Sequence, residues 1–118
     1  MSSSESVTIV LGSSAYQSER AFTALNFAQT AILEGMKVKV FLFEDGIFLG
    51  KKGQEPGNFK NAEEWLKQVI ADGADVKACG TCIKERGVSE KEFIEGVVKG
   101  TMHDMVSWIR DTDKAVFF

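Results

Sequence analysis

The sequence predicts an α/β protein of three layers, in which a five-stranded parallel sheet lies between helices. Two observations carry this prediction. Short β-branched runs alternate along the chain with segments of helical periodicity, and parallel neighbouring strands need such crossovers. A single Pro and eleven Gly occur in 118 residues, so regular elements run uninterrupted and end at Gly. The length of 118 residues allows one domain, spanning 1–118, with one core.

The amino-terminal elements read as strand, loop, helix and strand. The β-branched run 7–11 stops at Gly12, and the loop 13–18 ends in a serine that can cap a helix. Apolar residues recur at helical spacing over 19–34, and Gly35 stands where a left-handed cap is expected. The segment 38–43 is almost wholly apolar at its end, which is typical of a strand covered on both faces.

Residues 44–60 contain four Gly and the only Pro, and we expect a long loop with turn chemistry. Four apolar residues lie within it, namely Ile47, Phe48, Leu49 and Phe59. Apolar side chains on a surface loop indicate a partner or a lid, so this segment is expected to contact another subunit.

The second half repeats the alternation. Asn61 and Glu64 open a helix that Gly73 closes, and a strand over 74–78 delivers the chain to Cys79. Ser89 with Glu92, and Thr101 with Asp104, have the spacing of capping boxes. The remaining elements are a short helix at 80–86, a strand at 96–98, a last helix on which Met102, Met105, Val106 and Ile109 share a face, and a strand at 115–118.

Composition excludes several function classes. Hydrophobic residues make up 44% of the chain, so a compact fold is expected. The net charge is −3 and no basic block occurs, which argues against direct nucleic-acid binding. No apolar run is long enough to span a membrane, and the amino terminus has no secretory pattern. We therefore expect a cytoplasmic protein without a membrane role.

The candidate site follows from the sheet. In an open parallel sheet, ligand and catalytic groups gather at the carboxyl ends of the strands. Residues placed at that edge are Ser13, Ser14, Asp45, Gly46, Cys79, Gly80, Thr81 and Cys82. We predict Cys79 and Cys82 as catalytic groups and the other six as the pocket around them.

Cys79 is predicted as a nucleophile, because a thiol at a helix start faces unpaired backbone N–H groups that favour the thiolate. Cys82 lies three residues further, so it either resolves an oxidised Cys79 or is an ordinary core residue. The alternative interpretation of Cys79 is that it is a small hydrophobic residue buried at the end of a strand, without a chemical role. A zinc site would need four ligands, and the chain offers two Cys and the distant His103, expected to face solvent, so no metal is predicted.

Four segments together resemble the DsrE/TusD sulfur-relay family of small sulfurtransferases. They are the opening strand with its Ser-containing loop, the segment 40–47 with its Phe-x-Asp-Gly pattern, Cys79 followed seven residues later by Arg86-Gly87, and the closing stretch 100–118. The resemblance implies a persulfide carried on Cys79 without a cofactor, sulfur donor and acceptor proteins as partners, and a homotrimer or homohexamer. Members of the TusD type lack a second Cys at the position of Cys82.

An alternative hypothesis is a flavodoxin-like binding module. The hydroxyl-rich stretch from Ser13 to Ser18 precedes a helix, where backbone N–H groups can hold a phosphate. Both cysteines would then be structural. The sequence favours the sulfur carrier, and leaves open whether the protein turns over as an enzyme.

Overall fold

A computed structural model describes residues 5–57 and 60–118. Its five strands form one parallel sheet in the order β4-β3-β2-β1-β5. The strands are β1 (Ser6–Leu11), β2 (Lys37–Leu42), β3 (Asp75–Cys79), β4 (Val97–Gly100) and β5 (Lys114–Phe117). Phe59 and Met1 to Ser4 lie outside the described residues, so the expectations that involve them have no structural account.

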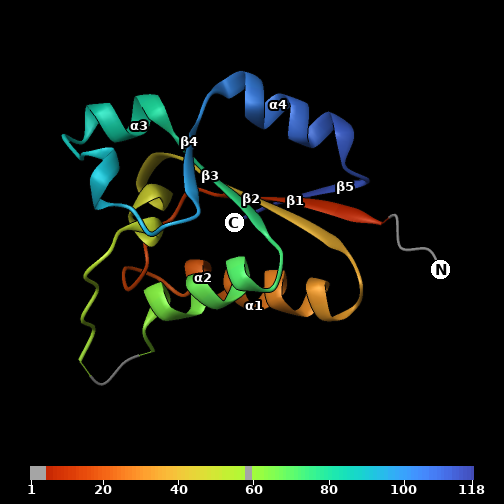
Figure 1. Ribbon diagram of the computed structural model, residues 1–118, viewed down its shortest axis with the longest axis horizontal. Helices are drawn as coiled ribbons and strands as arrows, with labels where there is room; N and C mark the ends of the chain where they lie inside the picture. Colours follow the sequence, from red (N-terminus) through yellow and green to blue (C-terminus); the bar gives the residue numbers. More distant parts are fainter. Residues whose placement is uncertain (1–4, 58–59) are drawn as a thin grey trace.

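Helices cover both faces of the sheet, which confirms the predicted three-layer α/β/α architecture (Figure 1). One face carries α1 (Arg20–Leu33) and α2 (Ala62–Ala71), and the other carries α3 (Gly80–Glu85) and α4 (Met102–Asp111). Two 3-10 helices, η1 (Glu44–Gly50) and η2 (Glu90–Glu92), complete the described elements. None of the helices in the described ranges has the length and apolar character needed to cross a membrane.

The core follows the two central strands. Residues of β1 and β2 pair from Ser6 with Lys37 to Leu11 with Leu42, and the last three residues of each strand are buried. Burial on both faces explains why these strands read as continuous apolar runs. Both strands point their carboxyl ends at one edge, and the backbone N–H of Phe43 donates to Leu11 O at 3.0 Å there.

The predicted helix boundaries are set by local capping. The Asn61 side chain accepts from the backbone N–H of Glu64 at 3.1 Å. Thr101 and Asp104 form a complete capping box, and so do Ser89 and Glu92. These contacts satisfy backbone N–H groups that a helix start leaves unpaired. Gly35 follows α1 with a φ of +89°, the left-handed conformation predicted for it.

The expectation of a long surface loop at 44–60 is wrong for its first part. Residues Glu44–Gly50 form η1, and Ile47 and Leu49 are fully buried in the core. Burying these two side chains removes apolar surface from water, which outweighs the turn preference of the neighbouring glycines. Ile47 and Leu49 therefore supply no exposed apolar patch, and the subunit contact predicted for them loses its basis.

Helix α4 turns only part of its apolar stripe toward the sheet. Met105 and Trp108 pack against the core, and the Trp108 ring meets Phe41 edge-on at a centroid distance of 6.1 Å. Met102 and Val106 keep 57% and 51% of their surface exposed. The helix thus presents an apolar strip to solvent beside the site described below.

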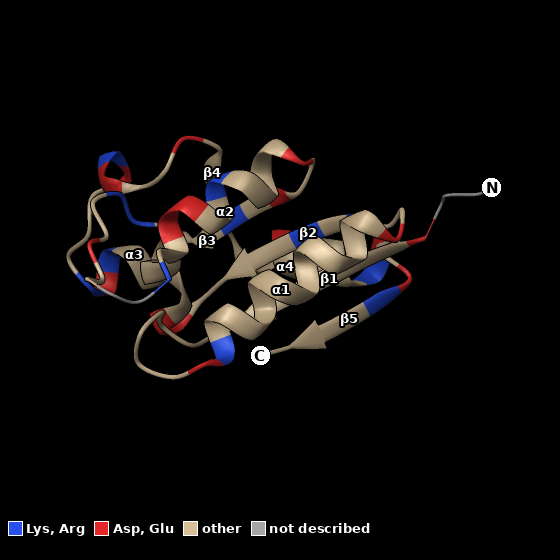
Figure 2. Cartoon of the chain, turned by 90° about the horizontal axis from the view of Figure 1, so that it is seen from below, with Lys and Arg blue, Asp and Glu red and all other residues tan. Residues whose placement is uncertain are grey.

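Charge is unevenly spread over the helices. Figure 2 shows α1 without a charged residue after Arg20, although acidic and basic residues are interspersed elsewhere in that view. The Lys39 and Lys77 ammonium groups lie 5.1 Å and 4.9 Å from the Trp108 ring centroid. These cation–π contacts let two lysines lie on the sheet face beneath α4.

Candidate functional site

Cys79 ends strand β3 and lies at the carboxyl edge of the sheet, the placement derived from its position in the sequence. Its paired neighbour on strand β4 is Gly100. The side chain is buried, with 9% of the residue exposed. The cover is thin, because Gly80 is only half-buried and Thr81 is exposed. The thiol therefore lies directly beneath the surface formed by the first turn of α3.

The two cysteines are brought together by that turn. Cys79 is the N-cap of α3, and the backbone N–H of Cys82 donates to its Sγ at 3.4 Å. Cys82 is 8% exposed, and both residues are free thiols. Helix α3 has only six residues, and this direct hydrogen bond is the backbone contact that the structure gives the Cys79 sulfur.

A second backbone donor reaches Cys82 from η1. The N–H of Glu44 donates to the Cys82 Sγ at 3.0 Å. Glu44 has a φ of +50°, a left-handed conformation that costs a non-glycine residue about 1 kcal/mol. This backbone contribution is not predictable from the sequence, where its only local signal is the turn-forming Asp45-Gly46 pair.

An ion pair ties η1 to α3 above Cys82. The Arg86 Nε donates to Asp45 Oδ1 at 3.0 Å, and another guanidinium nitrogen lies 3.4 Å from the carbonyl oxygen of Cys82. Asp45, predicted as a pocket residue, therefore lies in the ion pair that joins η1 to the end of α3. The ion pair is partly exposed, so its role is chiefly to hold the two elements in place.

Burial raises the pKa of the Cys82 thiol, and a side-chain hydrogen bond with Cys79 raises it further. The N–H of Glu44 and the charge of Arg86 act in the opposite direction, without reversing the shift. Cys82 is therefore a protonated thiol at neutral pH, since its ordinary pKa is already 9.0. A protonated thiol can donate a proton to a neighbouring atom.

The glycines predicted for the pocket have packing roles. A Cβ built on Gly46 would lie 2.1 Å from the carbonyl oxygen of Leu11, so η1 fits against the end of β1 only without a side chain. A Cβ on Gly80 would lie 3.1 Å from Lys99 Cγ and Cδ. The side chain of Lys99 therefore runs over the entry to α3, beside Cys79.

The two serines lie further along the edge. They follow β1, and β2 separates this strand from β3, which carries Cys79. The hydroxyl of Ser14 donates to the neighbouring carbonyl of Ala15 at 3.2 Å. Both serines are half-buried, so the structure places them at the predicted edge but one strand away from the thiols.

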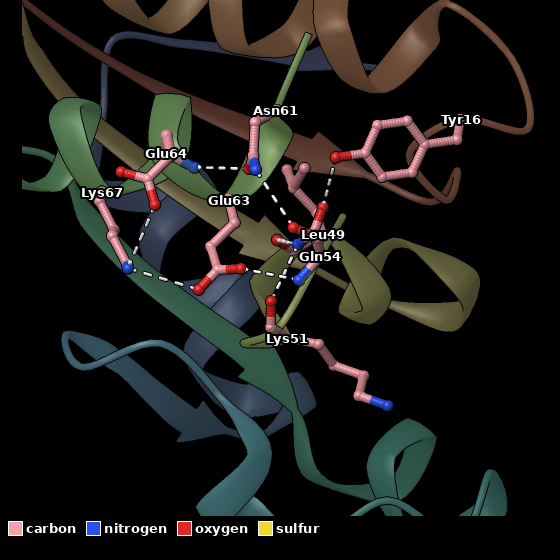
Figure 3. A network of polar contacts seen from close by, with 8 residues as sticks. All are labelled: Tyr16, Leu49, Lys51, Gln54, Asn61, Glu63, Glu64 and Lys67. Carbon is pink, nitrogen blue, oxygen red and sulfur yellow. Dashed lines mark hydrogen bonds and ion pairs between the residues drawn. The ribbon is translucent and has the colours of Figure 1, made fainter. Parts of the chain in front are cut away.

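The loop that contains these serines is anchored by Tyr16 (Figure 3). The Tyr16 hydroxyl donates to Gln54 Oε1 at 2.9 Å and accepts from the backbone N–H of Ala62 at 2.9 Å. Gln54 in turn donates through Nε2 to the carbonyls of Leu49 and Lys51. The network joins the loop after β1, the segment after η1 and the start of α2.

Glu63 completes this network and was not anticipated from the sequence. It is 7% exposed, accepts from the backbone N–H of Gln54 at 2.8 Å, and pairs with Lys67 at 3.4 Å. Burial alone would raise the pKa of Glu63, but the hydrogen bonds from Gln54 and Lys67 outweigh it and lower the pKa. No local pattern distinguishes Glu63 from the exposed Glu64 beside it.

The described residues hold no cluster of metal ligands, and the single histidine lies in α4. Within the ranges 5–57 and 60–118, no three His, Cys, Asp or Glu side chains gather as a metal site. His103 lies in the first turn of α4 and is exposed, where the sequence predicted it.

Comparisons with known proteins cover nearly the whole chain. The sequence model of the DsrE/DsrF-like family matches residues 5–118. The uncharacterized protein MK0008 of Methanopyrus kandleri is 55% identical over 112 residues, covering 95% of this chain and 93% of the relative. The sulfurtransferase TusD homolog of Vibrio parahaemolyticus is 27% identical over 128 residues, covering 94% and 95% of the two chains.

A solved structure matches the fold closely. The crystal structure of the ychN protein from E. coli superposes with a TM-score of 0.90 at 31% identity, covering 97% of this chain and 99% of that one. The match therefore includes the sheet edge and the segments η1 and α3 that surround the two cysteines.

Proposed function

The chain belongs to the DsrE/DsrF-like family, and from this we propose that it is a sulfur carrier or sulfurtransferase that relays sulfane sulfur as a persulfide on Cys79. The observation that carries the proposal is a cysteine at the carboxyl end of β3, with a backbone N–H directed at its sulfur. Similarity to a TusD homolog supports sulfur relay as the general role.

The chemistry needs only the protein's own groups and two partners. The Cys79 thiolate attacks the outer sulfur of a donor persulfide, the S–S bond of the donor breaks, and the donor leaves as a thiolate. The product is a persulfide on Cys79. An acceptor thiolate then attacks the outer sulfur and restores the Cys79 thiolate. The N–H of Cys82 stabilises the anion before attack and after release.

Access to Cys79 requires movement of its cover. Cys79 is 9% exposed as a residue, Gly80 and Thr81 follow it in the first turn of α3, and the Lys99 side chain lies beside Gly80. This cover is thin and contains a glycine, so a local opening of the first turn of α3 costs much less than global unfolding. A docking donor would select the open conformer.

We propose that the protein assembles as a homotrimer or homohexamer through the exposed apolar strip beside Cys79. The strip consists of Met102 and Val106 of α4, and Val98 of β4, which is 56% exposed, precedes it in the chain. Gly100 pairs with Cys79 and lies two residues before Met102, so the strip begins at the edge that holds the thiol. Apolar residues grouped on a surface indicate a protein contact.

The flavodoxin-like alternative finds no favouring contact at its loop. A ligand phosphate there would meet the carboxylate of Glu19, which occupies the N-cap of α1. Tyr16 fixes the loop to Gln54 and Ala62 instead. The sulfur-carrier proposal accounts for the thiol pair, which this alternative leaves without a role.

Whole-protein mass spectrometry tests the proposal. The reduced protein is incubated with a persulfide donor without oxygen, as wild type, Cys79→Ser and Cys82→Ser. We expect Cys82→Ser to gain the mass of one sulfur atom and Cys79→Ser to gain none. Sulfur uptake that survives Cys79→Ser would eliminate the assignment. Flavin bound to the purified protein would instead favour the flavodoxin-like alternative.

A further inference from the structure

We infer that Cys82 is a resolving thiol, which converts the Cys79 persulfide into an internal disulfide and releases sulfide. This inference rests on the proposed persulfide of Cys79 and adds a sulfane-reducing activity to it. It is carried by the juxtaposition of two free thiols in one helical turn, both shielded from solvent. A carrier that only passed sulfur onward would need a single thiol.

The geometry places the Cys82 thiol in contact with Cys79 across the first turn of α3. The Cys82 backbone nitrogen already lies 3.4 Å from the Cys79 Sγ, and the two side chains share a hydrogen bond. External thiols have little access to Cys79, which is 9% exposed. Reaction between neighbouring groups in a closed site is favoured by a high effective concentration, so Cys82 competes strongly with an acceptor that is not yet docked.

The step balances within the protein. The Cys82 proton passes to the outer sulfur of the persulfide, and the Cys82 thiolate so formed attacks the Sγ of Cys79. A Cys79–Cys82 disulfide forms, the bond from Cys79 to the outer sulfur breaks, and the outer sulfur leaves as hydrosulfide. The outer sulfur is reduced to sulfide, while the two cysteine sulfurs are oxidised to the disulfide. A dithiol reductant then restores both thiols for another turnover.

The surroundings of Cys82 suit this step. Because its pKa is raised, Cys82 keeps the proton that the leaving sulfur needs. As that proton departs, the N–H of Glu44 at 3.0 Å stabilises the negative charge that develops on the sulfur. The Asp45–Arg86 ion pair at 3.0 Å holds η1 against α3, and so keeps this donor in place.

A single-turnover experiment tests the inference. Reduced wild type and Cys82→Ser are loaded with glutathione persulfide without oxygen, freed of the donor and followed in parallel. Released sulfide is trapped with monobromobimane, and the protein is alkylated and weighed at each time. We expect wild type to release sulfide in step with the formation of a Cys79–Cys82 disulfide. Cys82→Ser should keep its persulfide about tenfold longer or more.

The outcomes separate the two proposals. Equal persulfide lifetimes in both proteins, with no disulfide in wild type, would overturn the role of Cys82 and leave the carrier intact. Absence of sulfur, sulfide and disulfide from both proteins would overturn the carrier and this inference with it. Should Cys82→Ser fail to fold, peptide mapping of the wild-type disulfide decides the question, with Cys82→Ala as the second variant.

Discussion

Replacing Gly46 by Ala should destabilise the fold strongly, because Gly46 is buried against the end of β1, although its neighbour Asp45 is exposed. The added Cβ would lie 2.1 Å from the Leu11 carbonyl oxygen and 2.9 Å from its carbon. That oxygen also accepts from the N–H of Phe43, so the backbone cannot move without breaking the end of the β1–β2 pairing. Overpacking a rigid site costs about 3 kcal/mol. Ala restricts the unfolded chain more than Gly does, and this effect offsets about 1 kcal/mol of that cost.

The net loss of about 2 kcal/mol should lower Tm by about 10 °C for a domain of this size. Urea unfolding followed by circular dichroism measures the change in the free energy of unfolding directly. Gly80→Ala is the matched control, because its Cβ would meet the flexible side chain of Lys99 at 3.1 Å and the Gly100 carbonyl oxygen at 3.4 Å, which is an ordinary contact distance. It should change the unfolding free energy by less than about 1 kcal/mol. If Gly46→Ala were as stable as wild type, the packing of η1 against Leu11 would be refuted.

Two further predictions concern stability and assembly. Since the pKa of Glu63 is lowered in the folded protein from its ordinary 4.5, its charge stabilises the fold above that pH, and this stabilisation is lost as the pH falls through the folded pKa. Glu63→Gln should therefore lower the free energy of unfolding by about 1 kcal/mol near neutral pH. The urea midpoint of this variant should also depend less on pH in the acid range than that of wild type. Plots of the midpoint against pH that run parallel for the two proteins would exclude the effect. Val106→Glu should reduce the assembly to smaller species in sedimentation velocity, while Asp111→Lys on the far side of α4 should sediment as wild type. An unchanged mass for Val106→Glu, or a monomeric wild type at micromolar concentration, would exclude the proposed contact.

The fold was predictable because its signals are local. The capping pair Thr101 and Asp104, the left-handed Gly35 and the apolar runs of β1 and β2 lie within a few residues of the features they determine. Parallel pairing then follows from the alternation of strands and helices. Cys79 could be placed at the sheet edge from the sequence, because the predicted strand ends directly before it.

Other features depend on contacts between distant segments. Ile47 and Leu49 lie among glycines in the sequence, and their burial becomes evident only when η1 is seen packed into the core. The rotation of α4 is fixed by Thr8, whose hydroxyl donates to the Trp108 carbonyl at 3.0 Å across 100 positions. The buried carboxylate of Glu63 depends on the backbone of Gln54, nine residues away. No periodicity in the sequence encodes such partners.

The central claim is that sulfur enters this protein on Cys79. The most direct measurement is tandem mass spectrometry of wild-type peptides, alkylated immediately after brief exposure to the donor, so that fragments distinguish Cys79 from Cys82. We expect the additional sulfur on Cys79 at the earliest times, with the disulfide appearing later. First appearance of the sulfur on Cys82, or uptake at neither residue, would contradict it.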